Sequence, residues 1–194
     1  MPKSFRTLLL SLPMLFLPTL AYAGPIYTVS RTVGAGSVVG TIQTDGTTGV
    51  VGVPNLLDWT LTLNAGAGPF TFLGPLSGSN SFVLIGGTSF TASLTSLLFD
   101  FSSSDHYVGF LDPVFANFWC LEGTSGFCSS HPGAETVAIL GPSAFALVSA
   151  DRSGIVSVAD SGLAPVPEPA TLLLFGTTAA GLGLARWRQH RPKR

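Results

Sequence analysis

Between residues 24 and 165 the chain is a succession of short apolar runs that turn-forming residues separate. The runs are rich in Val, Ile, Thr and Phe, which favour extended backbone, whereas Gly, Pro, Asn and Asp gather between them. Examples of such turns are Thr44-Asp45-Gly46, Gly78-Ser79-Asn80 and Asp151-Arg152-Ser153-Gly154. Strands of this length and spacing predict an all-β domain, either an antiparallel β-sandwich or a barrel-like closure of the same strands.

The individual strands follow from the same pattern. We expect them at residues 27–33, 37–44, 56–64, 70–73, 82–85, 89–101, 106–111, 114–120, 135–140, 144–150 and 155–159. Within 58–63 apolar and polar residues alternate, so Trp59, Leu61 and Leu63 point to one face of the strand. Trp59 is therefore predicted to be a core residue rather than a platform for a ligand.

The N-terminal segment, residues 1–23, has the features of a secretory signal peptide. Lys3 and Arg6 precede an apolar stretch over residues 8–20, and Ala21-Tyr22-Ala23 stands before Gly24. A positive region, a short hydrophobic region and an Ala-x-Ala site are the three parts of such a signal. We expect export through the Sec translocon and cleavage by signal peptidase between Ala23 and Gly24.

The C-terminal segment, residues 166–194, combines a short motif, an apolar run and a basic end. Residues 170–185 carry no charge and would span about 24 Å as a helix, close to the thickness of a bilayer core. Cations follow this run at once, and they favour the cytoplasmic side of a membrane. They are Arg186, Arg188, Arg191, Lys193 and Arg194. The sequence predicts a transmembrane helix at 170–185 with the preceding domain on the far side of the inner membrane.

Val166-Pro167-Glu168-Pro169 stands immediately before this run, and its prolines hold the backbone extended. The motif, the apolar segment and the Arg cluster together resemble the PEP-CTERM sorting signal of exported proteins in Gram-negative bacteria. The resemblance implies recognition by an exosortase, which would cut near the motif and pass the protein to the cell surface or extracellular matrix. Val166, Pro167, Glu168 and Pro169 would be recognition residues, not catalytic ones.

Once both ends are set aside, the remaining domain at 24–165 is strongly acidic. It contains two arginines, Arg31 and Arg152, against nine carboxylates, a formal charge of −7. Nucleic-acid binding requires clustered cations, so nucleic acid is excluded as a partner. An acidic surface domain is compatible with exopolysaccharide as a partner, but acidity alone does not demonstrate one.

Cys120 and Cys128 are the two cysteines of the chain. In an exported protein they are expected to form a disulfide, which would close a short loop. Zinc is not expected because two thiols with His131 nearby do not supply four ligands. We therefore expect no metal ion and no cofactor.

No catalytic residues can be named from the sequence. A Gly-x-Ser-x-Gly elbow is absent, and Ser104, Asp105 and His106 are neighbours in sequence that would point apart on a strand. The chain is thus predicted to be a non-enzymatic surface or matrix protein with a structural or interaction role. The alternative is a carbohydrate-binding module that uses exposed aromatics, with an envelope hydrolase as a third hypothesis. The aromatic candidates are Tyr107, Phe115, Phe118 and Trp119.

Overall fold

The computed structural model describes residues 24–124, 126–128, 131–142 and 144–162. The expected signal peptide at 1–23 and the expected helix at 170–185 lie outside these residues, as do Val166 to Pro169 and the basic residues after 185. In the part of the chain that the structure describes, no helix has the length and apolar character needed to cross a membrane. The expected signal peptide and the expected sorting segment are therefore described from the sequence alone.

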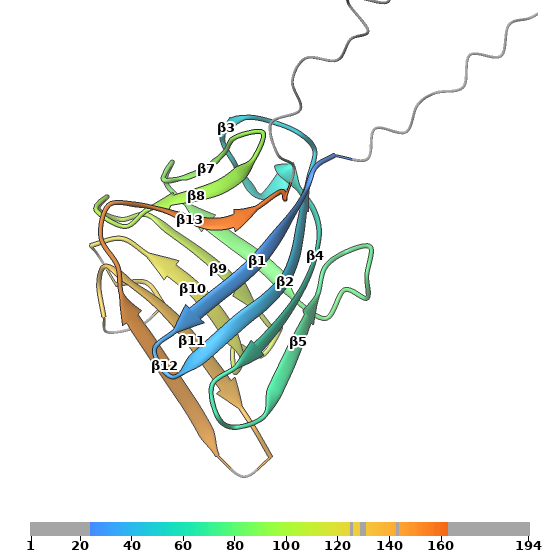
Figure 1. The fold of residues 1–194 in the computed structure, drawn as a ribbon. Helices are drawn as coiled ribbons and strands as arrows, with labels where there is room; N and C mark the ends of the chain where they lie inside the picture. Colours follow the sequence, from blue (N-terminus) through green and yellow to red (C-terminus); the bar gives the residue numbers. More distant parts are fainter. Residues whose placement is uncertain (1–23, 125, 129–130, 143, 163–194) are drawn as a thin grey trace, which may run out of the picture.

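The described residues form two antiparallel sheets that pack face to face (Figure 1). Sheet A has the order β3-β7-β8-β13-β1-β2-β4-β5, and sheet B has the order β12-β11-β10-β9-β6. The strands of sheet A are β1 (Ile26–Val33), β2 (Gly36–Thr44), β3 (Gly49–Val50), β4 (Leu56–Asn64), β5 (Pro69–Leu73), β7 (Phe90–Ala92), β8 (Ser96–Asp100) and β13 (Ile155–Asp160). Those of sheet B are β6 (Phe82–Gly86), β9 (Tyr107–Leu111), β10 (Phe118–Glu122), β11 (Ala134–Leu140) and β12 (Phe145–Asp151). The predicted all-β, sandwich-like architecture is confirmed for this part of the chain.

The core lies between the two sheets and is built on aromatic side chains. Trp59 of sheet A meets the Phe110 ring edge to face at 5.5 Å, and Phe110 stacks on Trp119 at 5.4 Å, both from sheet B. Trp59 is 4% exposed, and its indole Nε1–H donates to the Ser81 hydroxyl over 2.8 Å. The prediction that Trp59 is a core residue is therefore confirmed.

Two predicted strands differ clearly from the structure, whereas the bounds of the others agree to within one residue at each end. The expected strand at 89–101 is divided into β7 and β8 because Ser93 closes a turn, its hydroxyl accepting the N–H groups of Thr95 and Ser96. The expected strand at 114–120 begins only at Phe118, since the Asp112 carboxylate accepts the Ala116 N–H and holds the preceding residues in a turn. The two-residue strand β3 and the short 3-10 helix η1 (Val53–Asn55) were not predicted.

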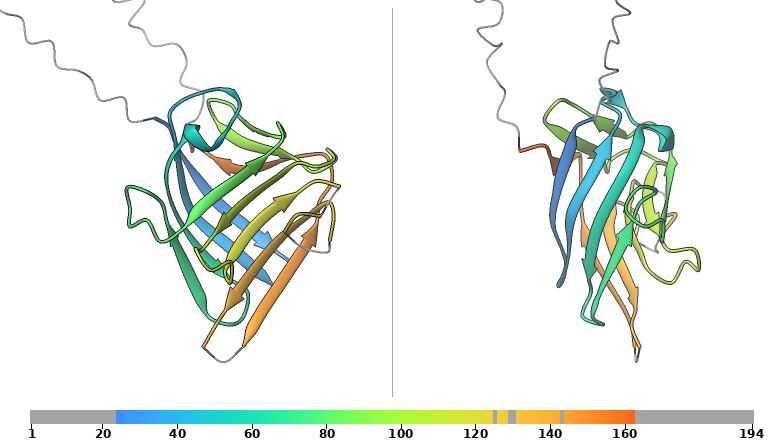
Figure 2. Two further views of the ribbon diagram at one scale, coloured as in Figure 1. Left: turned by 180° about the vertical axis from the view of Figure 1, so that it is seen from behind. Right: turned by 90° about the vertical axis from the view of Figure 1, so that its right-hand side faces the viewer.

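The last strand returns to the first. β13 pairs with β1, with Thr28 opposite Asp160, and on its other side with β8. The start of β1 and the end of β13 thus lie side by side at one end of the domain, the upper end in Figures 1 and 2. All strands of the described residues lie between Ile26 and Asp160.

Candidate functional site

The outer face of sheet B carries a continuous row of apolar residues. The strand register places Phe82, Leu111, Phe118, Ala138 and Leu147 opposite one another in turn, from β6 across to β12. Side chains on adjacent strands that lie directly opposite point to the same face. The row therefore crosses the whole sheet on the side away from the core, and at its end Leu147 is 43% exposed.

The expected disulfide ties a loop onto this face. Cys120 on β10 bonds to Cys128, with the Cα atoms 6.1 Å apart. Glu122 anchors the same loop, because its carboxylate Oε2 accepts the N–H groups of Phe127 and Cys128, each over 2.7 Å. Cys120, Glu122 and Cys128 are close enough together to suggest metal ligands, but both sulfurs are used in the disulfide. The cluster is thus a structural clasp that holds Phe127 and Cys128 on this face.

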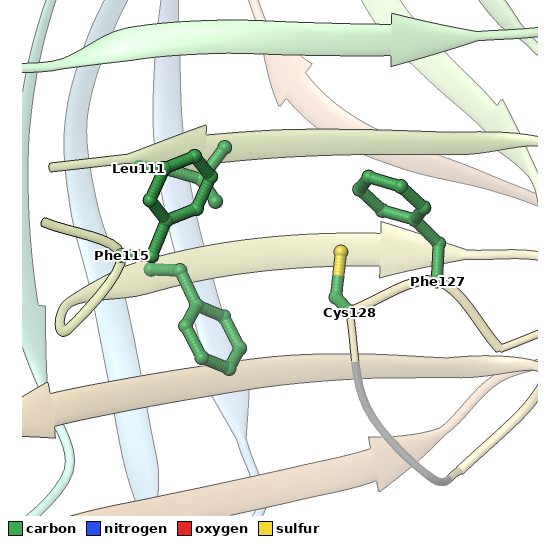
Figure 3. Close-up of a pocket in the computed structure, with 5 residues that line it drawn as sticks. Leu111, Phe115, Phe127 and Cys128 are labelled. Atoms are coloured by element: carbon green, nitrogen blue, oxygen red, sulfur yellow. The ribbon is translucent and has the colours of Figure 1, made fainter. Parts of the chain in front are cut away.

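Beside the clasp lies an apolar hollow of about 210 Å³ (Figure 3). Its lining consists of Leu111, Phe115, Phe118, Phe127 and Cys128. Phe115 is 60% exposed and has a φ of 59°, a left-handed conformation that is uncommon for a bulky residue. Strained and exposed aromatics of this kind cluster at binding sites. The hollow is lined by apolar groups and has the size of one large side chain.

A stacked aromatic pair stands at one side of this hollow. The rings of Tyr107 and Phe127 lie 3.7 Å apart and almost parallel, at 7°. Three of the four candidate aromatics, Tyr107, Phe115 and Phe118, are thus at or beside the hollow. The inclusion of Trp119 was wrong, because Trp119 is 0% exposed and follows Phe118 on the same strand, where adjacent side chains point to opposite faces.

Phe127 was missed, although the sequence contained a signal for it. It directly precedes Cys128, and the disulfide to β10 brings that segment back over sheet B. Phe127 is 51% exposed. The signal in the sequence was therefore an aromatic residue directly before a cysteine that was expected to form a disulfide.

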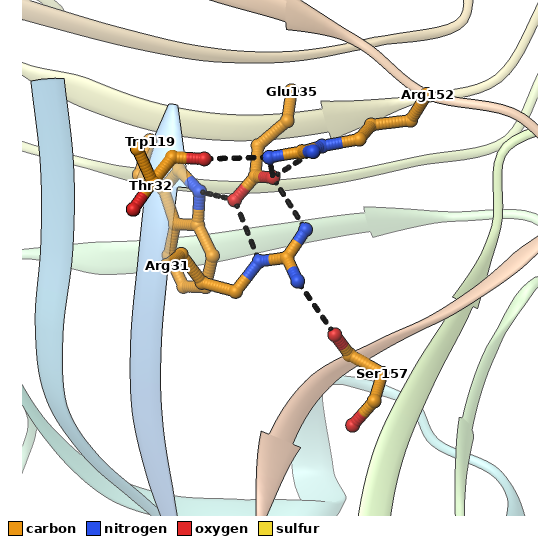
Figure 4. A network of polar contacts seen from close by, with 6 residues as sticks. All are labelled: Arg31, Thr32, Trp119, Glu135, Arg152 and Ser157. Atoms are coloured by element: carbon orange, nitrogen blue, oxygen red, sulfur yellow. Dashed lines mark hydrogen bonds and ion pairs between the residues drawn. The ribbon is translucent and has the colours of Figure 1, made fainter. Parts of the chain in front are cut away.

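A buried ionic network joins the two sheets on the opposite side of sheet B (Figure 4). The Glu135 carboxylate on β11 is fully buried and accepts hydrogen bonds from Arg31 on β1, at 2.6 Å and 3.2 Å. Arg152 donates from Nε to the same carboxylate over 3.0 Å and forms an ion pair with it through Nη2 at 2.9 Å, and the Trp119 indole donates over 3.1 Å. The arginines also donate to main-chain carbonyls, Arg31 to Ser157 and Arg152 to Thr32.

This network uses both cations of the domain. Arg31 and Arg152 are the two Lys or Arg residues between positions 24 and 162, and each is paired with Glu135. Neither guanidinium is left for an acidic ligand. The other carboxylates of the domain have no Lys or Arg within this range to neutralise them, so the surface of the domain is negative.

A second hollow, of about 240 Å³, lies where the chain crosses between the sheets. It brings Ser89, Asp100 and His106 together, the combination of residue types that a hydrolase requires, and the Ser89 hydroxyl contacts His106 Nδ1. The Asp100 carboxylate is used otherwise, since it accepts hydrogen bonds from Ser102 and Ser103. The Ser102 hydroxyl and N–H are the main reason why the pKa of Asp100 is lowered.

The remaining sequence candidates for chemistry are separate from this hollow. Asp105 has a φ of 58° and sits in the turn before β9, and His131 is exposed in the loop before β11. Ser104 and Asp105 are the neighbours of His106 in the sequence, whereas the residues that the fold gathers beside it are Ser89 and Asp100. Ser89 could not be found from the sequence because the contact joins positions 17 residues apart across two sheets.

Comparison with known proteins identifies one segment of the chain. Residues 165–189 match the PEP-CTERM protein-sorting motif, which covers Val166 to Pro169, the apolar run and Arg186 and Arg188. Comparisons with curated proteins and with solved structures gave no match. The chain therefore carries a PEP-CTERM sorting motif and is an exported protein that is anchored in a membrane and sorted by an exosortase.

Proposed function

We propose that this protein is delivered to the cell surface or extracellular matrix as an intact β-sandwich that acts by contact rather than by catalysis. The observation that carries the proposal is that β13 ends at Asp160 and pairs with β1, whereas the sorting motif begins at residue 165. A cut within the motif would remove no strand and no core residue of the part of the chain that the structure describes. The folded domain would therefore survive processing unchanged.

The pathway has three steps in this proposal. The signal peptide at 1–23 directs the chain to the Sec translocon, and signal peptidase cuts between Ala23 and Gly24. The segment at 170–185 then holds the chain in the inner membrane, with Arg186, Arg188 and the following cations on the cytoplasmic side. The exosortase finally reads Pro167, Glu168 and Pro169 and cuts nearby.

The sorting step is tested by Glu168→Ala in a strain that has its exosortase, with Asp160→Asn as a control that lies before the motif. The Glu168 variant is expected to stay in the membrane fraction at full length, whereas the control is processed like the wild type. Equal processing of the Glu168 variant and the wild type would refute the assigned role of the motif.

For the contact role, the apolar hollow on sheet B is the best-supported surface. Its volume suits one apolar side chain of a partner better than a sugar chain, which needs several hydrogen-bonding groups around it. A fixed disulfide and Glu122 hold Phe127 at its edge, so the surface is preformed. Preformed apolar pockets are where interface energy concentrates.

Exopolysaccharide binding is the second candidate, and the stacked pair of Tyr107 and Phe127 favours it. Aromatic faces can stack on the apolar face of a sugar ring. Glycan-array binding of the processed protein tests this candidate, with Phe127→Ala as the variant and Leu76→Ala as a control at another exposed apolar residue on a different loop. Loss of binding in the Phe127 variant alone would support it, and no binding by the wild type would remove it.

A further inference from the structure

Four exposed aliphatic side chains gather at the end of the domain where the chain leaves for the sorting motif. They are Ile26 (54% exposed), Val50 (52%), Val53 (44%) and Leu94 (76%). We call the surface that they form the exit end. Exposed apolar side chains are common one at a time, but a group of them at one place indicates a contact surface.

Hydrogen bonds tie the Leu94 turn directly to the departing chain. The Ser161 N–H, just after β13, donates to the Thr95 carbonyl over 2.7 Å. The Tyr27 hydroxyl of β1 donates to the Ser93 carbonyl over the same distance. Leu94 therefore stands between the first strand of the domain and the point where the chain continues toward the motif.

The other three residues belong to neighbouring segments. β3 carries Val50 opposite Thr91 of β7, one strand away from the Leu94 turn. η1 carries Val53 and is linked to β2 by the hydrogen bond from the Asp45 N–H to the Asn55 carbonyl. Ile26 begins β1, and the views in Figures 1 and 2 agree in placing these segments together at the end with the two termini.

The length of the chain beyond the domain limits how far this surface can be from a membrane. The residues between β13 and the apolar segment are 161–169, which can span at most about 30 Å when fully extended. A domain on so short a tether has its exit end directed toward the bilayer.

The charges at the exit end decide which kind of lipid surface fits. Asp45, Asp58 and Asp160 lie near it, and both cations of the domain are paired with Glu135 in the network between the sheets. An anionic lipid surface would therefore repel this end, whereas an uncharged one would accept its aliphatic groups. We propose that the exit end rests on an uncharged, zwitterionic bilayer surface until the exosortase cuts the tether, and this inference rests on the membrane anchor of the proposed function.

The experiment uses the full chain in phosphatidylcholine vesicles and hydrogen exchange measured by mass spectrometry. Flotation of the chain with the vesicles first tests the anchor itself. Peptides that cover residues 49–55 and 93–95 are then expected to exchange more slowly in the vesicles than in the processed protein from the cell surface. Replacement of part of the phosphatidylcholine by phosphatidylglycerol is expected to weaken that protection.

Matched variants separate lipid contact from a general effect of the tether. Val50→Ser with Leu94→Ser is expected to lose the protection, whereas Val114→Ser with Leu76→Ser, a Val and a Leu that are 76% and 74% exposed on other loops, is expected to keep it. A chain that fails to float would overturn the proposed anchor. A chain that floats but shows no protection at the exit end, or equal protection in both double variants, would overturn this inference alone.

Discussion

Replacement of Glu135 by Gln directly alters the ionic network that joins the two sheets. The side chain keeps its shape but loses its negative charge, and its amide group presents one acceptor oxygen in place of two. Four hydrogen bonds from Arg31, Arg152 and Trp119 converge on the carboxylate, which is fully buried, and Arg152 adds a further ion-pair contact. The change leaves two guanidinium groups facing a neutral amide.

The size of the effect follows from the burial of the partners. Removing one member of a buried ion pair costs roughly 3–5 kcal/mol because the remaining charge is left uncompensated. The Arg31 and Arg152 side chains are 14% and 26% exposed, so water can solvate part of each guanidinium. We therefore expect the lower end of the range, about 3 kcal/mol of unfolding free energy, and a fall in Tm on the order of 10 °C.

The assay is urea unfolding followed by tryptophan fluorescence, with Asp151→Asn as the control. Asp151 is exposed at the end of β12, and its replacement removes the same charge without touching the network. If Glu135→Gln lowers the unfolding free energy no more than the control does, the account of the network is refuted. A triple variant with Arg31→Met, Glu135→Leu and Arg152→Met should recover much of the loss, because apolar groups of similar volume often replace buried ion pairs without cost.

Three further changes test other parts of the structure. The double variant Cys120→Ser with Cys128→Ser should lose about 2.6 kcal/mol of unfolding free energy in the chain-entropy model, measured in urea without reductant, and an unchanged midpoint would contradict the clasp. Asp45→Asn should reduce the amount by which the unfolding free energy falls between pH 5 and pH 3. The pKa of Asp45 is lowered chiefly by the Asn55 side chain, so its contribution is present above the ordinary carboxyl pKa near 4 and is lost as pH falls through the lower folded value. Urea unfolding at pH 5 and pH 3 measures this slope, and an equal slope in variant and wild type would count against it. Gly40→Ala should destabilise the domain by more than about 1 kcal/mol, because Gly40 has a φ of 147° and an added Cβ would meet the Thr60 carbonyl of β4. A Tm of that variant that differs from the wild-type Tm by less than about 2 °C would contradict the close approach of β2 and β4.

The sequence was sufficient for the features that depend on local pattern. Alternation in 58–63 placed Trp59 in the core, and the turn residues marked most strand ends. The breaks at Ser93 and Asp112 were missed because single side chains accept main-chain N–H groups there, and composition does not reveal that geometry. The face of Trp119 was also misassigned, since it depends on strand parity relative to Phe118.

Contacts between residues that are far apart in the sequence could not be predicted from the sequence. Arg31 and Glu135 are 104 positions apart, and their pairing required both the order of the strands and the face of β11. The same holds for Ser89 and His106, which meet only because the chain crosses between the sheets. The hollow itself was not predicted: Phe115 and Phe118 were named as candidate exposed aromatics, whereas Phe127 reaches the hollow only because the disulfide holds its segment over sheet B.

The most direct test of the central claim is the intact mass of the protein collected from the surface of a strain that has its exosortase. The account predicts one species that begins at Gly24 and ends near Pro169, without the apolar segment and the basic residues that follow it. It also predicts that this species keeps the Cys120–Cys128 disulfide and unfolds as one domain. A surface protein whose mass still includes Arg194 would contradict the account.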